Sequence, residues 1–108
     1  MEYRIIKSPS EGTKDIIKKR LGRVQEDFSL DHVDAIGMVQ GRMIDMLCAA
    51  DIAEKASGVE VYDLRGICPQ HMVLIVMLGD TSSVENAIEQ ISIKLKEGTY
   101  SDYSQVDR

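Results

Sequence analysis

The sequence contains no tryptophan and is poor in phenylalanine, proline and cysteine: its 108 residues include one Phe, two Pro and two Cys. Its longest unbroken apolar run, Met72–Leu78, has seven residues, whereas a membrane-spanning helix needs about 20. The N-terminal residues lack the apolar stretch that is typical of a secretory signal. We therefore expect a cytoplasmic protein that does not enter a membrane.

Positive charge is also scarce, since the formal net charge is −5. The net charge is unevenly distributed: it is +2 over residues 1–30 and −7 over residues 31–108. No basic stripe with interleaved aromatic residues is present, which argues against nucleic-acid binding. The cluster of basic residues between Lys14 and Arg23 is interpreted as the solvated face of a helix.

The two cysteines, Cys48 and Cys68, are twenty residues apart. Two cysteines are too few for a disulfide framework, and this spacing is not that of a zinc finger. In a reducing compartment we expect both to be thiols. The length fits a single domain.

Hydrophobic periodicity and turn residues predict seven elements in the order β-α-β-α-β-β-α. This order predicts an α+β fold with helices packed on a small antiparallel or mixed sheet. The expected strands cover residues 3–6, 33–39, 59–65 and 71–78, and the expected helices cover residues 12–21, 42–56 and about 80–96.

Several local features are expected within these elements. The continuous apolar run Met72–Leu78 predicts a central strand that is covered on both faces. Gly37, inside a strand, indicates close backbone approach. Ser10 or Thr13 can cap the first helix, and Asp80 or Ser82 the last, where Ser82 and Glu85 have capping-box spacing.

Helical spacing also predicts which residues are buried. In the helix over residues 42–56 the apolar stripe is Met43, Leu47, Ala50 and Ala53 or Glu54, with Ile44, Cys48 and Ile52 on the adjoining stripe. Cys48 is therefore interpreted as a core residue. In the last helix the expected buried stripe is Val84, Ile88, Ile91 and Leu95.

The segment Gly66-Ile67-Cys68-Pro69-Gln70 stands at the tip of the predicted hairpin. Such tips favour Gly, Asn, Asp and Ser, so an Ile and a Cys are unexpected there. Two interpretations remain open: the cysteine folds back under a neighbouring loop, as buried free cysteines do, or it is presented as a thiolate.

A thiolate at Cys68 has few possible roles. As a nucleophile it would need a base, but Pro69 and strand geometry separate it from His71, and no third orienting group is apparent. A metal or cluster site needs three or four ligands, and one chain offers this single loop cysteine. The ligand number is reached only if several copies meet at a symmetry axis.

A longer pattern resembles a known family. The pattern consists of a strand, an Ala-Ala-Asp helix, a hairpin and a Gly-Asp turn into a Val-x-x-Ala helix. Its residues are Asp34–Val39, Met43–Ala56 with Cys48-Ala49-Ala50-Asp51, Val59–Tyr62, Met72–Leu78 and Gly79–Ala87. Over about residues 33–92 it resembles the bacterial microcompartment (BMC) shell domain. The strand and helix expected before Leu21 resemble elements that end the ordinary domain, so the chain is similar to the circularly permuted subclass.

This resemblance implies a fold, a cofactor and partners. It implies one permuted BMC domain of ferredoxin-like architecture over residues 1–98, a polar tail over 99–108, and a homohexamer that tiles a flat shell with other shell proteins. The Gly66–Gln70 segment is similar to the pore motif of glycyl-radical-type microcompartment shell proteins that carry an iron–sulfur cluster. By that resemblance, Cys68 from several subunits would hold one [4Fe–4S] cluster per hexamer. Gly66, Ile67, Pro69 and Gln70 would surround it.

The resemblance also leaves alternatives open. The cluster could transfer electrons across the shell or sense redox state. A cluster-free hexamer with a metabolite pore is a second interpretation, and a small thiol or zinc protein using Cys68 and His71 is a third. Permuted shell proteins often begin with a barrel that caps the pore. We expect none here, so that any cap would come from Thr99–Arg108.

Overall fold

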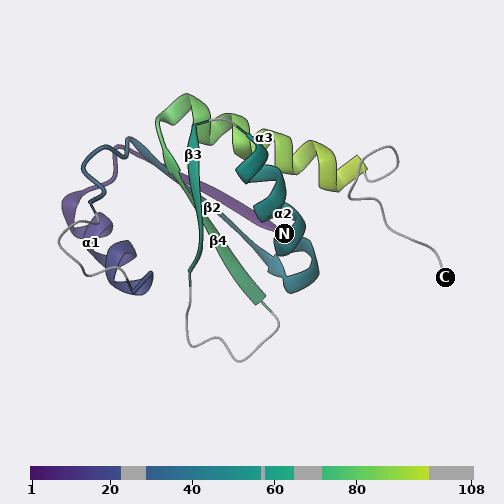
Figure 1. Cartoon of the computed structure of the whole chain (residues 1–108), viewed down its shortest axis with the longest axis horizontal. Helices are drawn as coiled ribbons and strands as arrows, with labels where there is room; N and C mark the ends of the chain where they lie inside the picture. The colour runs from purple at the N-terminus through teal and green to yellow at the C-terminus, as the bar shows by residue number, and fades with distance from the viewer. Residues whose placement is uncertain (23–28, 57, 65–71, 98–108) are drawn as a thin grey trace.

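The computed structural model describes residues 1–22, 29–56, 58–64 and 72–97. The predicted order of seven elements is confirmed (Figure 1). The elements are β1 (Glu2–Lys7), α1 (Glu11–Arg20), β2 (Ala35–Arg42), α2 (Met43–Lys55), β3 (Val59–Leu64), β4 (Met72–Gly79) and α3 (Thr81–Glu97).

The four strands form one antiparallel sheet in the order β1-β2-β4-β3. The apolar strand β4 lies between β2 and β3, as its sequence predicted. Residues Ile75 to Leu78 of β4 are at most 5% exposed. Strands β1 and β3 form the two edges of the sheet.

Alternate residues of the inner strands face two separate hydrophobic cores, which explains why β4 has no polar side. On one face, Val39, Ile75 and Met77 pack under α2 and α3. On the other face, Ile36, Val76 and Leu78 pack under α1 and the segment before β2, which contribute Ile17, Leu30 and Val33. Figure 1 shows α1 near one end of the sheet, so this second cover spans only part of its face.

The first helix begins and ends where its sequence predicts. The hydroxyl of Ser10 accepts a hydrogen bond from the Thr13 backbone N–H at 3.2 Å, which satisfies one of the free donors of the first turn. Gly22, just beyond the helix, has a φ of 71°, a left-handed conformation that glycine adopts without strain. Ile17 is the buried residue of α1.

The predicted buried face of α2 is partly wrong. The residues that α2 buries are Met46, Ala49, Ile52 and Ala53. Met43, Ile44 and Leu47 are exposed instead, and Cys48 is half-buried rather than enclosed in the core. The first half of α2 is apolar on nearly all sides, so its periodicity does not select a face. The helix follows β2 without a loop, and the small side chains of Ala49 and Ala53 fill the core-facing positions.

Gly37 lies where α3 crosses β2, and the predicted close approach is confirmed. A Cβ atom at this position would lie 2.7 Å from Cγ1 of Val84 and 3.2 Å from Cδ1 of Ile88. Val84 is fully buried and β-branched, so its side chain has little freedom to move away.

We predict that Gly37→Ala lowers the free energy of unfolding by about 1–3 kcal/mol, because the added methyl group overpacks this contact. Urea unfolding followed by circular dichroism measures the change. The matched control is Gly12→Ala in α1, where an added Cβ meets no atom within 4 Å. The control should be neutral or stabilising, and equal losses in the two variants would contradict the prediction.

The N-terminus of α3 is capped by Asp80. Its Oδ1 accepts the Ser83 backbone N–H at 2.8 Å and the Ser82 hydroxyl at 3.0 Å. Of the two predicted caps, the structure therefore uses Asp80. The hydrogen bonds from Ser83 and Ser82 lower the pKa of the Asp80 carboxyl below its ordinary value, because they favour the charged form. The predicted stripe of α3 is confirmed, since Val84 and Ile91 are buried with Ala87, while Ile88 and Leu95 pack against the core.

We predict that Asp80→Asn destabilises the protein at neutral pH, although asparagine also caps helices. The ionised carboxylate interacts favourably with the helix N-terminus, and its lowered pKa means that this stabilisation is present above the ordinary carboxyl pKa. It is lost as the pH falls through the folded-state pKa.

Urea midpoints of the wild type and Asp80→Asn should therefore differ at neutral pH and converge in acid. Glu89→Gln, which alters an exposed carboxylate in the middle of the same helix, is the control. A difference that grows toward low pH would contradict the assignment.

Candidate functional site

The predicted site residues Gly66, Ile67, Cys68, Pro69 and Gln70, together with His71, lie outside the described residues. The strands that flank them are β3 and β4. Leu64 at the end of β3 pairs with Leu74, and Met72 at the start of β4 pairs with Arg42, the last residue of β2. The segment of residues 65–71 therefore connects β3 and β4 at the end of the sheet where β2 passes into α2.

The described part of the chain contains no group of three or more His, Cys, Asp or Glu side chains that could hold a metal ion. The described cysteine, Cys48, is half-buried on α2. One copy of the described fold therefore supplies no ligand set for a cluster. Among the described helices, none is both long enough and apolar enough to span a bilayer.

His32 lies on the surface, as its polar sequence context indicates. Its Nε2 is 3.1 Å from Oε1 of Glu60, and its side chain is 62% exposed. The hydroxyl of Tyr62 donates to the other oxygen of Glu60 at 3.3 Å. An exposed pair of this kind contributes little to stability.

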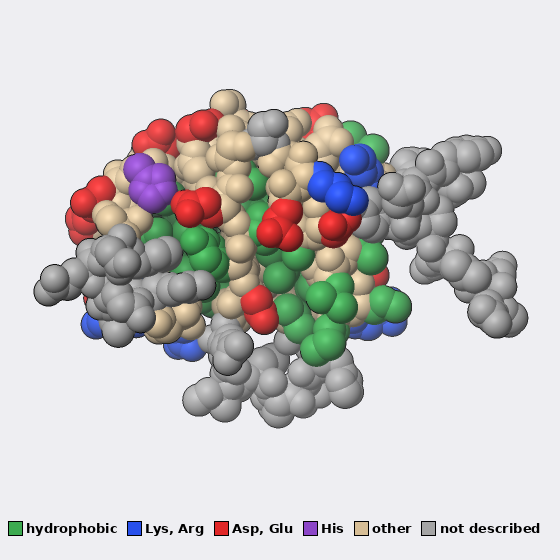
Figure 2. Space-filling model, in the orientation of Figure 1, with side chains coloured by type: hydrophobic (Ala, Val, Ile, Leu, Met, Phe, Trp, Pro, Cys, Tyr) green, Lys and Arg blue, Asp and Glu red, His purple; other side chains and the backbone are tan. Residues whose placement is uncertain are grey.

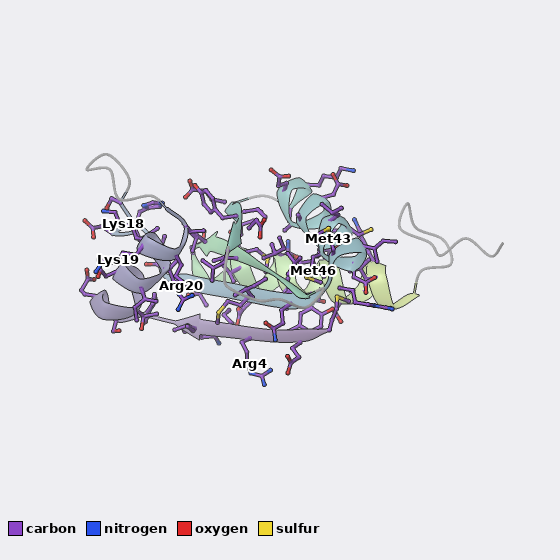
Figure 3. The ribbon with its side chains drawn as sticks, turned by 90° about the horizontal axis from the view of Figure 1, so that it is seen from below. Arg4, Lys18, Lys19, Arg20, Met43 and Met46 are labelled. Carbon is purple, nitrogen blue, oxygen red and sulfur yellow. The ribbon has the colours of Figure 1, made fainter. Side chains whose placement is uncertain are left out.

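Two of the basic residues of α1, Lys14 and Lys19, are paired with acidic neighbours. Nζ of Lys19 is 3.0 Å from the carboxylate of Asp15, and that of Lys14 is 3.5 Å from Glu11. Figure 3 shows Lys18, Lys19 and Arg20 on α1, at the end of the molecule away from Met43. The interleaved acidic side chains support the interpretation of this cluster as a solvated helix face.

An open groove of about 320 Å³ lies along the side of α2 where the helix packs on β3 and β4. We call it the α2 groove; its lining residues are Met43, Met46, Leu47, Ala50, Glu54, Val61, Tyr62, Asp63, Val73 and Ile75. Sequence reasoning missed this groove because it assigned Met43 and Leu47 to the core.

The other face of the sheet has a hollow of about 250 Å³, which α1 does not cover. It is lined by Glu2, Arg4, Met38, Gln40 and Leu74. The amide of Gln40 donates to Oε1 of Glu2 at 2.6 Å, linking β2 to the edge strand β1. Figure 3 shows Arg4 pointing away from the sheet on the side opposite α2.

The described residues thus form a small antiparallel sheet with α2 and α3 on one face, α1 on part of the other, and an exposed groove beside α2. A model of the BMC domain matches residues 35–107 of the sequence. The chain therefore belongs to the BMC domain family of bacterial microcompartment shell proteins, which are structural and non-enzymatic.

Solved structures give the same assignment. The chain is 51% identical to the GrpU microcompartment shell protein from Clostridiales bacterium 1_7_47FAA, a ligand-free structure, over 91% of this chain and 95% of that one, with a TM-score of 0.67. The ligand-free GrpU protein from Pectobacterium wasabiae is 26% identical over 84% of this chain and 99% of that one, with a TM-score of 0.63.

A third similar structure is CutR in a screw form with a pitch of 41.9 Å. It is 28% identical, covers 85% of this chain and 78% of that one, and has a TM-score of 0.57. Among curated proteins no significant match was found. The chain is thus a GrpU-like component of a microcompartment shell.

Proposed function

We propose that this shell protein forms homohexamers in which Cys68 residues from several subunits hold one [4Fe–4S] cluster at a central pore. The observation that supports the proposal is the pairing of the strands that flank the Gly66–Gln70 segment in the sequence. Strands β3 and β4 pair up to Leu64 and Leu74, and β4 begins at Met72, opposite Arg42. A loop that joins strands at one end of a sheet can meet the same loop of other copies at a symmetry axis.

The number of ligands supports a shared site. A [4Fe–4S] cluster is held by cysteine thiolates, commonly four, and the described residues of one chain contain no ligand group. Six copies of Cys68 around four irons exceed the number required, so the ligation cannot keep sixfold symmetry. A bound cluster would supply one-electron redox chemistry, used either for transfer across the shell or for sensing.

The neighbours of Cys68 have chemical roles in this proposal. Gly66 leaves room for the backbone near the axis, Ile67 provides an apolar collar that limits water, and Pro69 restricts the backbone after the ligand. Backbone N–H groups near Gln70 would hydrogen-bond to sulfur and adjust the reduction potential.

We also propose that residues 1–98 form one circularly permuted BMC domain, followed by a polar tail over residues 99–108. Two observations support it. The family match begins at Ala35, the first residue of β2. The preceding strand β1 nevertheless completes the sheet, since Glu2–Lys7 pairs with Ala35–Gln40 in continuous antiparallel register.

We predict that anaerobically purified protein contains iron and acid-labile sulfide in equal amounts, about four of each per six chains. The substitution Cys68→Ser should abolish both, together with the visible absorption, while leaving the size of the assembly unchanged. Cys48→Ser, at the half-buried cysteine of α2, is the matched control and should retain the cluster.

Other results would favour the alternatives. Protein that assembles but contains no iron after reconstitution would indicate a cluster-free shell subunit with a metabolite pore. Stoichiometric zinc that is lost in Cys68→Ser would indicate a zinc site instead.

A further inference from the structure

The α2 groove combines an apolar surface with two carboxylates. Most of its lining side chains are apolar, and its acidic members are Glu54 of α2 and Asp63 of β3. Among the described residues that line it, none is a lysine, arginine or histidine. Figure 2 shows hydrophobic side chains gathered at the lower right, where α2 begins, with acidic side chains next to them. The groove therefore suits a ligand that is partly apolar and positively charged.

Both acidic residues lie on the side of the sheet that carries α2. Val59 and Val61 of β3 pack against the core under α2 and α3. Because side chains alternate along a strand, Asp63 lies on the same face as these two valines. Glu54 follows Ala50 by four residues, a spacing that keeps both on one side of the helix, and both line the groove. The two carboxylates therefore border the groove from different walls.

Neither carboxylate forms an ion pair within the described part of the chain. The other two acidic residues of α2 do: the carboxylate of Asp45 lies 3.8 Å from a basic side chain, and that of Asp51 lies 2.7 Å from another. Glu54 and Asp63 are both exposed. A cation that binds between them would break no ion pair of the described residues.

The two carboxylates stand toward opposite ends of the groove. Helix α2 begins at the end of the sheet where β2 ends and leads to the end where β3 begins. Glu54 is the last residue but one of α2, near the start of β3. Asp63 is the last residue but one of β3 and pairs with Ile75 near the start of β4. Rises of about 1.5 Å per helical residue and about 3.3 Å per strand residue separate them by roughly 7 Å along the sheet.

We propose that the α2 groove binds a linear aliphatic diamine, with one ammonium group at Glu54 and the other at Asp63. Aliphatic amines, like the lysine side chain, are protonated at neutral pH, so a diamine carries a cation at each end of an apolar chain. With bonds of about 1.5 Å, about four or five methylene groups span the separation. These groups would contact apolar lining residues such as Ala50 and Val61, where their removal from water is favourable.

Other ligand classes match the groove less well. An anionic ligand would meet two like charges. A monoamine can pair with one carboxylate and leaves the other without a partner. A divalent metal ion makes no use of the apolar lining, and the described residues contain no group of three or more His, Cys, Asp or Glu side chains that could hold one. The inference concerns one chain and is independent of the proposed cluster.

Isothermal titration calorimetry of the full-length protein with 1,4-diaminobutane tests the proposal, at low ionic strength where screening is weak. We expect a dissociation constant of about 1 mM for so small a ligand, and weaker binding of 1-aminobutane, which has the same chain with one ammonium group. Glu54→Gln and Asp63→Asn should each weaken diamine binding about two- to fivefold, as expected for the loss of one exposed ion pair.

The matched control is Glu89→Gln, which removes an exposed carboxylate of α3 outside the groove and should bind the diamine as the wild type does. Far-ultraviolet circular dichroism verifies that each variant is folded. Absence of binding by the wild type at diamine concentrations well above 1 mM would overturn the inference. So would equal affinity for 1-aminobutane, equal displacement of the diamine by the same concentration of magnesium ion, or an equal effect of the three substitutions.

Discussion

The whole fold depends on the need to cover β4 on both faces. An interior strand whose side chains are all apolar is stable only when each face is removed from water. Helices α2 and α3 cover one face, where Ile75 and Met77 lie. The other face, with Val76 and Leu78, depends on α1 and the segment before β2. The N-terminal residues therefore belong to the folding unit, although the family match begins only at β2.

The sequence predicted the order of elements and the caps because those signals are local. Ser10 and Asp80 act on backbone groups three residues away, and the apolar run of β4 is visible in any window. The orientation of α2 is not a local property. Its first half is apolar on nearly all sides, and the junction with β2 and the small size of Ala49 and Ala53 decide which side is buried.

For the candidate site, the sequence shows the motif but not the number of copies that assemble. The motif around Cys68 is distinctive in the sequence, but the proposed cluster needs ligands from several copies, and a single sequence carries no local signal for the number of copies. The first turns of α2 are the reverse case. Periodicity assigned side chains such as Leu47 to the core, but the structure leaves Leu47 exposed.

The two edge strands affect how copies can be crowded together. Strand β1 carries charged side chains at Arg4 and Lys7, with Lys7 held 2.9 Å from Glu85, and β3 is six residues long with exposed Glu60 and Asp63. Short, charged edges discourage pairing with strands of another molecule. Copies of this shell protein can therefore be crowded together without strand exchange or fibril growth.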